Sequence, residues 1–335
     1  MIYGNFFSDD PRGKNAMFGE LVESPMGYYE LLKEHFQRLG IEINTPDVNY
    51  GKTVSFDLHI EGRHLIGDDN VPRYLIALEN PNHNQLNGSQ LYFSNFSKVF
   101  TWNAELLNLV NVIKVLPPHQ ISHSQFSSYH DRDIFSTLIN GNKAFRKKLP
   151  TDLYSERIST IRWYERNAPD EFELYGRGWD KPPPAFDLVG KMRRSIPSLG
   201  VKLLKNKCFP SYRGELQNKS EVLRRSKFSY CYENNRDLSN YITEKIIDAF
   251  VSGCVPIYWG ADNILDYIPA GCFIDRRNFR NTAEVHQHLL SISPEVYSEY
   301  QSNISKFLQS DVAKRFSFEH FVSVVTNEIA QDFDL

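Results

Sequence analysis

The sequence predicts an α/β protein made of two doubly wound domains, and three observations lead to this prediction. Residues 228–259 read as a strand, a helix and a second strand, a unit whose two strands are normally parallel. The first half of the chain alternates short apolar runs with helical patterns, which is typical of the same architecture. A length of 335 residues allows one large domain or two ordinary ones.

The first half supplies the strands and helices of one domain. An amphipathic helix is expected over residues 27–39, with Tyr28, Leu32 and Phe36 near helical spacing and Gly40 after its last turn. Strands are expected at residues 1–7, 41–43, 54–60 and 74–78, and the segments 93–102 and 112–116 complete the alternating pattern.

The second half continues the alternation. Helices are expected at residues 154–166, 221–226, 283–292, 294–307 and 317–329, and a strand at 172–175. Three consecutive prolines at 182–184 favour an extended segment, so we expect a loop region over 181–210.

The strand–helix–strand unit is the most informative stretch of the chain. The apolar and aromatic run 228–232 predicts a buried strand, which stops at the polar residues 233–235. A helix fits 243–252, with Thr243 or Asn240 as its cap and Gly253 as its stop. Its apolar residues fall on one face, and the next strand is 255–259.

Polar residues of this unit lie where a ligand would bind. Glu233 and Asn234 follow the carboxyl end of a strand, where open parallel sheets bind their ligands. Glu244 and Lys245 fall in the first turn of the helix, whose N-terminus attracts anions. We therefore interpret Lys245 as a ligand of a diphosphate group. The alternative is a solvated lysine beside Glu244.

The order of these motifs also resembles a known signature. The runs ENN, NYITEK, IIDAF, GCVPIYWG and FID are similar to the donor-binding region of the alpha-1,3/4-fucosyltransferases, glycosyltransferase family 10. The loop between residues 234 and 241 is about one residue longer than in that signature. The matching positions are Glu233, Asn234, Tyr241, Thr243, Glu244, Lys245, Val255, Pro256 and Gly260.

The resemblance implies the GT-B architecture, in which two Rossmann-like domains face across a cleft. Residues 1–150 are then expected to bind the acceptor and residues 151–310 the nucleotide sugar, while a terminal helix in 311–335 packs back on the first domain. The implied reaction is an inverting transfer of L-fucose from GDP-fucose to a hydroxyl of a galactose- or N-acetylglucosamine-containing glycan. A helix N-terminus with nearby cations can stabilise the leaving diphosphate as a metal ion would, so we expect catalysis without a metal ion or other cofactor.

A general base is expected in the first half. Glu79 follows the predicted strand 74–78, and family members carry a Glu-Asn pair after a similar strand, in which the Glu is the proposed base. The alternative is a loop acid that caps Asn82 or the next helix. Glu105 and Asp131 are the reserve candidates.

The resemblance also implies donor contacts. An arginine on the helix 154–166 is expected to face the diphosphate, and both Arg157 and Arg162 fit; either would otherwise be a surface charge paired with a nearby glutamate. Tyr241 and Glu244 are expected to bind the ribose or the fucose, and Asn234 to orient the donor. Glu233 is either a donor ligand or a structural partner of the Thr243 end of the helix.

Two other patterns raise the question of a metal site. His119 and His123 have i, i+4 spacing, but Pro117-Pro118 favours a loop and no third ligand is evident. Asp131-Arg132-Asp133 is formally a D-x-D pattern, which other glycosyltransferases use to hold a metal ion. We interpret it as a surface turn, because no clear strand precedes it.

Composition narrows the class of protein further. The net charge of −3, from 38 basic and 41 acidic residues, argues against a nucleic-acid partner. Four widely spaced cysteines and the absence of a signal-peptide pattern favour a cytoplasmic protein, and no run is long enough to span a membrane. Animal members of the family that the chain resembles carry a membrane anchor, so the resemblance implies a bacterial-type enzyme. The C-terminal amphipathic helices are candidates for a subunit interface or for peripheral membrane contact.

Two other functions remain as alternatives to a fucosyltransferase. One is a transferase that uses another nucleotide-diphospho-deoxysugar. The other is an inactive glycan- or nucleotide-binding protein.

Overall fold

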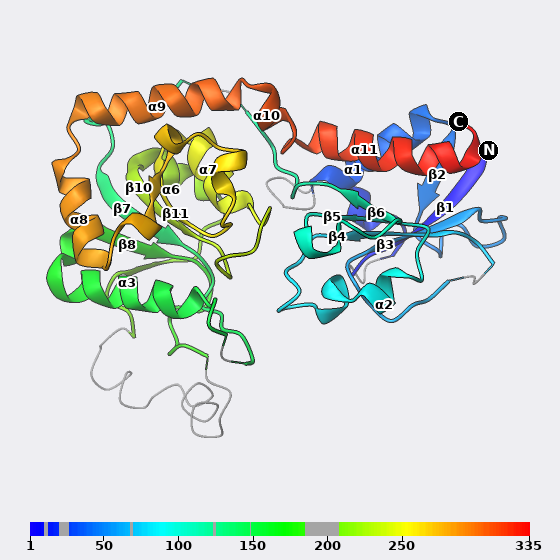
Figure 1. Cartoon of the computed structure of the whole chain (residues 1–335), viewed down its shortest axis with the longest axis horizontal. Coiled ribbons are helices and arrows are strands. Elements are labelled where there is room, and N and C mark those ends of the chain that lie inside the picture. Colours follow the sequence, from blue (N-terminus) through cyan, green and yellow to red (C-terminus); the bar gives the residue numbers. More distant parts are fainter. Residues whose placement is uncertain (10–12, 20–26, 68–69, 123–124, 148, 185–207) are drawn as a thin grey trace. The chain divides into compact units, whose positions relative to one another are not determined.

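The structure is a computed structural model that describes residues 1–9, 13–19, 27–67, 70–122, 125–147, 149–184 and 208–335. It divides into two compact units (Figure 1). Unit 1 comprises residues 1–121, 239–244 and 311–335. Unit 2 comprises residues 122–238 and 245–310.

Unit 1 contains a parallel sheet, in which the described residues form six strands in the order β2-β1-β3-β4-β5-β6. The strand order reverses between β1 and β3, and ligands of open parallel sheets bind beyond the carboxyl ends at such a point. The strands are β1 (Ile2–Phe7), β2 (Ile41–Asn44), β3 (Phe56–Ile60), β4 (Arg73–Ala77), β5 (Lys98–Thr101) and β6 (Val112–Lys114).

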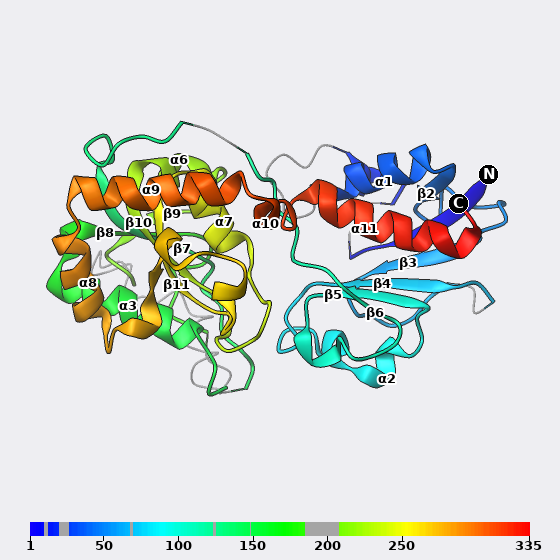
Figure 2. The same cartoon turned by 45° about the horizontal axis from the view of Figure 1, so that its top comes forward.

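Two helices cover one face of this sheet, namely α1 (Tyr28–Arg38) and α11 (Phe318–Ala330) (Figures 1 and 2). Their buried side chains share one apolar core with the sheet, and the rings of Tyr28 and Phe321 lie 5.0 Å apart. A smaller apolar cluster contains Leu75 and Val99 together with Phe93 of α2 (Gln90–Phe93). The terminal segment 311–335, which also contains α10 (Asp311–Lys314), is therefore part of unit 1.

Unit 2 contains a second parallel sheet, whose described strands have the order β12-β11-β10-β7-β8-β9. Its order reverses between β7 and β10, the arrangement of a dinucleotide-binding fold. The strands are β7 (Ile134–Ile139), β8 (Phe172–Tyr175), β9 (Tyr212–Gly214), β10 (Ser226–Tyr232), β11 (Val255–Trp259) and β12 (Ile274–Asp275). The two parallel sheets with their helices confirm the predicted fold class.

The helices of unit 2 follow the predicted apolar patterns. In α7, Ile246, Ile247 and Phe250 are buried, and the helix ends before Gly253, whose φ of 64° a side chain rarely tolerates. A Cβ atom at Gly253 would also lie 2.4 Å from the ring of Phe126. The described α-helices of the unit are α3 (Tyr154–Asn167), α6 (Lys219–Arg225), α7 (Glu244–Val251), α8 (Thr282–Ser291) and α9 (Pro294–Leu308).

Short 3₁₀ helices connect these elements in both units. They are η1 (Ala16–Phe18), η2 (Gln85–Gly88), η3 (Ala104–Leu106), η4 (Pro169–Glu171), η5 (Ile264–Asp266), η6 (Ala270–Cys272), η7 (Arg276–Asn278) and η8 (Gln331–Phe333).

The structure differs from the sequence prediction between residues 119 and 150. We expected a loop and a surface turn there, but β7 begins directly after Asp133 and pairs with both β8 and β10. Arg132 is 1% exposed and donates hydrogen bonds to the carbonyls of Leu223, Ser226 and Ser252, so a buried guanidinium anchors the start of the strand. Unit 2 consequently begins at residue 122 rather than at 151. Residues 212–214 form an edge strand that the sequence analysis did not predict.

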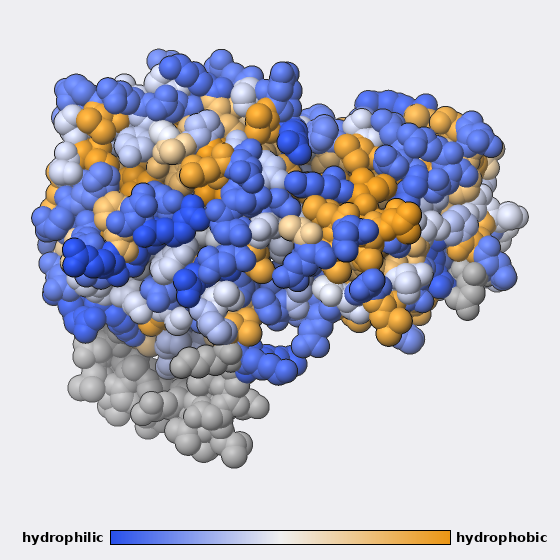
Figure 3. All heavy atoms as spheres, viewed as in Figure 1, coloured by the Kyte–Doolittle hydropathy of each residue, from blue (hydrophilic) through white to orange (hydrophobic). Residues whose placement is uncertain are grey.

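The surface carries interspersed polar and apolar side chains (Figure 3). The large apolar side chains with the greatest exposure come from separate elements and include Leu91 and Val110 of unit 1 and Leu265 of unit 2. Scattered apolar residues of this kind are normal for a folded domain. Within the described residues, no helix combines the length and the apolar character that a membrane crossing demands.

Candidate functional site

The carboxyl end of β10 lies at the point where the sheet of unit 2 reverses its strand order. Glu233 follows this strand, is fully buried, and its N–H donates to the carbonyl of Trp259 at 2.8 Å. Gly260 directly follows the neighbouring strand β11, and a Cβ atom there would lie 2.4 Å from Cγ of Glu233. The absence of a side chain at residue 260 therefore makes room for a buried glutamate at this strand exit.

Lys245 is the ionic partner of this glutamate. Its Nζ lies 3.1 Å from Oε2 of Glu233, and its side chain is only 11% exposed. A lysine in the first turn of a helix opposes the helix dipole, and the buried carboxylate offsets this effect. Lys245 is therefore not the solvated surface lysine of the alternative interpretation. The pair holds an ammonium group beside the N-terminus of α7.

Arg157 of α3 binds the backbone at the same carboxyl end of β10. Its Nη2 donates to the carbonyls of Tyr232 at 2.5 Å and Glu233 at 2.7 Å and to Oδ1 of Asn234 at 3.2 Å. The side chain is 2% exposed, and its guanidinium lies over the ring of Tyr154. We expected this arginine to face a diphosphate, but these bonds direct it to the protein backbone.

Arg162 lies elsewhere on the same helix. Its Nη1 donates to Oε2 of Glu165 at 2.6 Å, and its guanidinium lies 4.0 Å from the ring centre of Phe209. The two arginines are five positions apart in the sequence, so they project from different faces of the helix. The structure thus brings Arg157, and not Arg162, to the exit of β10.

Tyr241 and Thr243 belong to the short segment 239–244 that is part of unit 1. The ring of Tyr241 lies 4.6 Å from that of Trp102, and the amide of Asn240 donates to the Trp102 carbonyl at 3.0 Å. Tyr241 is 4% exposed, so much of its ring is covered. Glu244 is the first residue of α7, and Thr243 therefore occupies the position that normally caps a helix.

Glu79 lies in unit 1, just beyond the carboxyl end of β4. Its side chain is exposed, and Oε1 accepts a hydrogen bond of 2.8 Å from the N–H of Asn80. It does not cap Asn82, whose N–H is bound by Oδ1 of Asn80 at 2.8 Å. Nor does it cap the next helical elements, because Asn84 caps η2 and Ser89 caps α2. Glu79 thus follows a strand, at the edge of the sheet where ligands of such folds bind.

The reserve acids occupy other settings. Asp131 accepts hydrogen bonds from Ser128 near the amino end of β7, the edge of the sheet opposite to the strand exits. Glu105 lies in η3, after β5, and is exposed. Of the three acids, Glu79 and Glu105 follow carboxyl ends of strands.

The metal-ligand patterns are not assembled in the described residues. Asp133 forms an ion pair with Arg225, whereas Asp131 binds Ser128. His123 lies outside the described residues, and the backbone of His119 pairs with Phe316 and Phe318. Among the residues that the structure describes, no group of three or more His, Cys, Asp or Glu side chains is arranged to hold a metal ion. The four cysteines are free thiols, and three of them are buried.

Sequence analysis missed an arginine at the end of β12. Arg276 is 5% exposed, donates from Nε to the hydroxyl of Tyr232 at 3.1 Å, and lies 4.9 Å from the ring centre of Trp259. It adds a buried cation and an aromatic ring to the carboxyl edge of the sheet. A basic residue after a short strand normally indicates a surface turn, so only the tertiary contacts reveal it.

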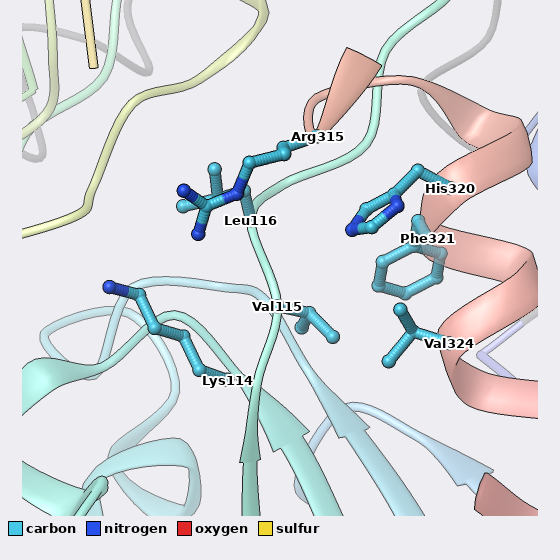
Figure 4. Close-up of a pocket in the computed structure, with 7 residues that line it drawn as sticks. All are labelled: Lys114, Val115, Leu116, Arg315, His320, Phe321 and Val324. Atoms are coloured by element: carbon cyan, nitrogen blue, oxygen red, sulfur yellow. The ribbon is translucent and has the colours of Figure 1, made fainter. Parts of the chain in front are cut away.

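A shallow pocket of unit 1 lies apart from all of these residues (Figure 4). It is formed by the end of β6 with the residues that follow it and by the first turns of α11, and Lys114, Arg315 and His320 approach its opening. None of the site residues predicted from the sequence lines it.

Part of the chain is similar to known glycosyltransferases. Residues 195–320 match the family model "Glycosyltransferase family 10 (fucosyltransferase) C-term". The chain is 36% identical over 74 residues to the alpha-(1,3)-fucosyltransferase FucT of Helicobacter pylori, covering 22% of this chain and 15% of the relative. It is 38% identical over 78 residues to an alpha-(1,4)-fucosyltransferase of Arabidopsis thaliana, covering 23% and 19%. The matches therefore span less than a fifth of these relatives.

Solved structures with the same fold cover nearly the whole chain. An alpha-glucosyltransferase in complex with UDP-glucose and DNA matches with a TM-score of 0.59 at 11% identity, covering 99% of both chains. An alpha1,3-fucosyltransferase with GDP-fucose matches with a TM-score of 0.51 at 13% identity, covering 98% of this chain and 90% of the other. At such identities the likeness shows the fold, and it is the GT-B fold that the sequence predicted.

Proposed function

We propose that this chain transfers L-fucose from GDP-fucose to a hydroxyl of a galactose- or N-acetylglucosamine-containing glycan, because residues 195–320 match the C-terminal model of glycosyltransferase family 10. The observation that carries the proposal is the Glu233–Lys245 pair at the N-terminus of α7, because it lies within the matched region and presents a cation beside a helix N-terminus. The relatives and the solved α1,3-fucosyltransferase support the choice of donor.

The donor diphosphate is proposed to bind at the start of α7. Lys245 and the N–H groups of the first turn neutralise the charge that builds on the phosphate as the glycosidic bond breaks. Glu233 holds the lysine, and Arg157 acts indirectly, by fixing the carbonyls at the exit of β10. Asn234 lies at this exit and is proposed to orient the donor.

The sugar and ribose contacts are proposed for the segment that enters α7. Glu244 and Tyr241 would hydrogen-bond the ribose or the fucose, and Thr243 would order the helix end between them. Arg162 has no place in this arrangement, because it binds Glu165 and Phe209 instead.

Glu79 is the proposed general base. The acceptor oxygen attacks the anomeric carbon from the face opposite to GDP, so a carbon–oxygen bond forms as the bond to the diphosphate breaks. The proton of the acceptor hydroxyl passes to the Glu79 carboxylate, and GDP leaves with the bonding electron pair. Attack from the opposite face inverts the anomeric configuration. The helix N-terminus and Lys245 supply the positive charge in this scheme, so we propose that no metal ion is needed.

The donor assignment is tested by thermal unfolding with GDP, UDP and dTDP. A ligand that binds only the folded protein raises its melting temperature, so GDP is expected to give the largest shift. A shift with UDP or dTDP alone would show that the donor carries a nucleotide other than GDP. The absence of a shift with all three nucleotides would favour a glycan-binding protein.

The metal-free scheme is tested by exhaustive chelation. Activity with GDP-fucose is expected to survive this treatment. Loss of activity that a divalent cation restores would refute the scheme.

The base assignment is tested by Glu79→Gln. General base catalysis contributes about 10²–10⁴-fold, so turnover is expected to fall at least 100-fold while the dissociation constant of GDP stays the same. Glu105→Gln is the matched control, because Glu105 also is an exposed acid beyond a strand of the same sheet. Full turnover in Glu79→Gln, or loss of turnover in Glu105→Gln, would show that a residue other than Glu79 is the general base.

A further inference from the structure

A second glutamate of unit 1 is bound to the backbone of Glu79. Glu61 directly follows β3, at the point where the sheet reverses its strand order. Its carboxylate accepts hydrogen bonds from the N–H of Leu78 at 3.2 Å and from the N–H of Glu79 at 3.0 Å, and a third from the side-chain amide of Asn87. Three N–H donors thus converge on one carboxylate.

Asn87 completes the contact. It is 1% exposed and lies in η2, and its Nδ2 also donates to the carbonyl of Glu79 at 2.9 Å. Its Oδ1 accepts from the N–H of Gly62 at 2.7 Å. Glu61 and Asn87 therefore bind both the N–H and the carbonyl of Glu79, which fixes the backbone from which the carboxylate of Glu79 projects.

The local backbone is strained to make this contact. Glu61 has a φ of 61°, in the left-handed region that a residue with a Cβ atom enters at a cost of about 1–3 kcal/mol. The next residue, Gly62, lies so close to η2 that a Cβ atom there would be 2.4 Å from Cβ of Leu86. Glycine or asparagine would relieve the strain at residue 61, but neither would supply the carboxylate that binds the three N–H groups.

We propose that Glu61 is a positioning residue that fixes Glu79 for abstraction of the acceptor proton. The inference rests on the proposed role of Glu79 as the base. Hydrogen bonds of a carboxylate to backbone N–H groups are charge-assisted, so they hold a loop more firmly than neutral hydrogen bonds do. An error of about 1 Å in the placement of a catalytic group can cost about 100-fold in rate.

The positioning role of Glu61 is expected to depend on pH, because only the ionised carboxylate accepts all of these hydrogen bonds. Burial, together with the charge of Glu79, raises the pKa of Glu61 to about 7. The other titratable groups that interact with this cluster are Tyr28 and Tyr29 of α1 and Arg63, which forms an ion pair with Asp9. When Glu61 takes up a proton, one oxygen becomes a donor and no longer accepts from the N–H groups. The contact with Glu79 therefore weakens as the pH falls through about 7.

The test compares Glu61→Gln with Glu42→Gln. Glu42 is a carboxylate of β2 in the same sheet that binds Asn44 and Lys52, so its substitution controls for the loss of a charge. We measure kcat and the KM of GDP-fucose between pH 5.5 and 8.5. Glu61→Gln is expected to lower kcat about 10–100-fold with the KM of the donor unchanged, and to lose the fall in kcat near pH 7. Glu42→Gln is expected to keep both the rate and the pH profile.

Two outcomes separate this inference from the proposed function. If Glu79→Gln is inactive while Glu61→Gln keeps the rate and the pH profile of the wild type, Glu61 has no positioning role and the proposed base stands. If Glu79→Gln is active, the proposed base itself is wrong. Asn87→Ala removes the contact to the Glu79 carbonyl and is the second variant should Glu61→Gln fail to fold. A wild-type kcat in folded Asn87→Ala would also overturn the inference.

Discussion

At the scale of single residues, the ion pair between Lys245 and Glu233 carries most of the functional argument. A charge buried with a partner is tolerated, whereas a buried charge without one costs several kcal/mol. The fully buried Glu233 therefore explains how a lysine of 11% side-chain exposure persists in the first turn of α7, where the helix dipole opposes it. The sequence identified both residues, but it left open whether Glu233 binds the donor or the protein.

Substitution of Lys245 by alanine tests its role toward the diphosphate. A charge-assisted hydrogen bond to a phosphate contributes about 1.5–3 kcal/mol, so GDP is expected to bind about 10–100-fold more weakly and kcat to fall as well. Isothermal titration calorimetry and initial rates measure the two quantities. Lys306→Ala is the control, because Lys306 is an exposed lysine of α9 in unit 2 that does not line the pocket beside Lys245. If Lys245→Ala binds GDP nearly as tightly as the wild type, Lys245 is not a ligand of the diphosphate.

Glu61 also predicts a dependence of stability on pH. Its pKa in the folded protein is about 7, above the ordinary value of 4.5, so the folded state binds more protons than the unfolded state between these values. The contribution of Glu61 to the free energy of unfolding is therefore greatest below pH 4.5, declines up to about pH 7 and is constant above that. Urea unfolding is expected to show that the wild type loses stability relative to Glu61→Gln between pH 5 and 7. Parallel curves would contradict this.

At the scale of elements, the end of α7 shows how local conformation and packing act together. Gly253 has a φ of 64°, and the ring of Phe126 occupies the space where its Cβ atom would lie. Gly40 ends α1 with a φ of 76°, but no atom lies within 4 Å of the place of its Cβ. The two glycines share the left-handed conformation and differ in the space around them.

This difference predicts unequal costs of substitution. Gly40→Ala is expected to destabilise the protein by about 1 kcal/mol through backbone strain alone. Gly253→Ala adds a clash with a ring and is expected to cost about 3 kcal/mol. Urea unfolding of the two variants measures the free energies, and equal losses would show that Phe126 moves aside without cost.

At the scale of the whole molecule, each unit is assembled from segments that are distant in the sequence. The core of unit 1 includes Phe321, Val322, Val325 and Ile329 of α11, which follow unit 2 in the chain. Lys98 of β5 also pairs with Asp332 at 2.8 Å, beyond the end of that helix. Unit 1 therefore depends on the last residues of the sequence.

Removal of residues 311–335 tests this dependence. The deletion uncovers apolar side chains of α1 and of the sheet, so unit 1 is expected to lose its cooperative unfolding transition and to bind the dye ANS. Calorimetry and fluorescence measure the two effects. Val325→Asp in the full chain is the matched variant, because it buries a charge in the same core. A deletion variant that keeps the transition of unit 1 would show that α11 is dispensable for this core.

Local patterns in the sequence determined much of this protein. The apolar spacing of α7, the strand β11 and the polar residues after β10 were predicted at or near their observed bounds, because they depend on residues close together in the chain. The motif around Lys245 indicated the similarity to glycosyltransferase family 10 and the GT-B fold for the same reason.

The tertiary structure decided the features that depend on distant residues. The strand β7 was missed because its six residues give a weak signal and its place between β8 and β10 is fixed only by pairing. The contacts of Arg157 with the β10 exit, of Glu233 with Lys245 and of Glu61 with Glu79 each join different elements. A side chain's partner depends on which segments the fold brings together, and spacing along the chain does not contain that information.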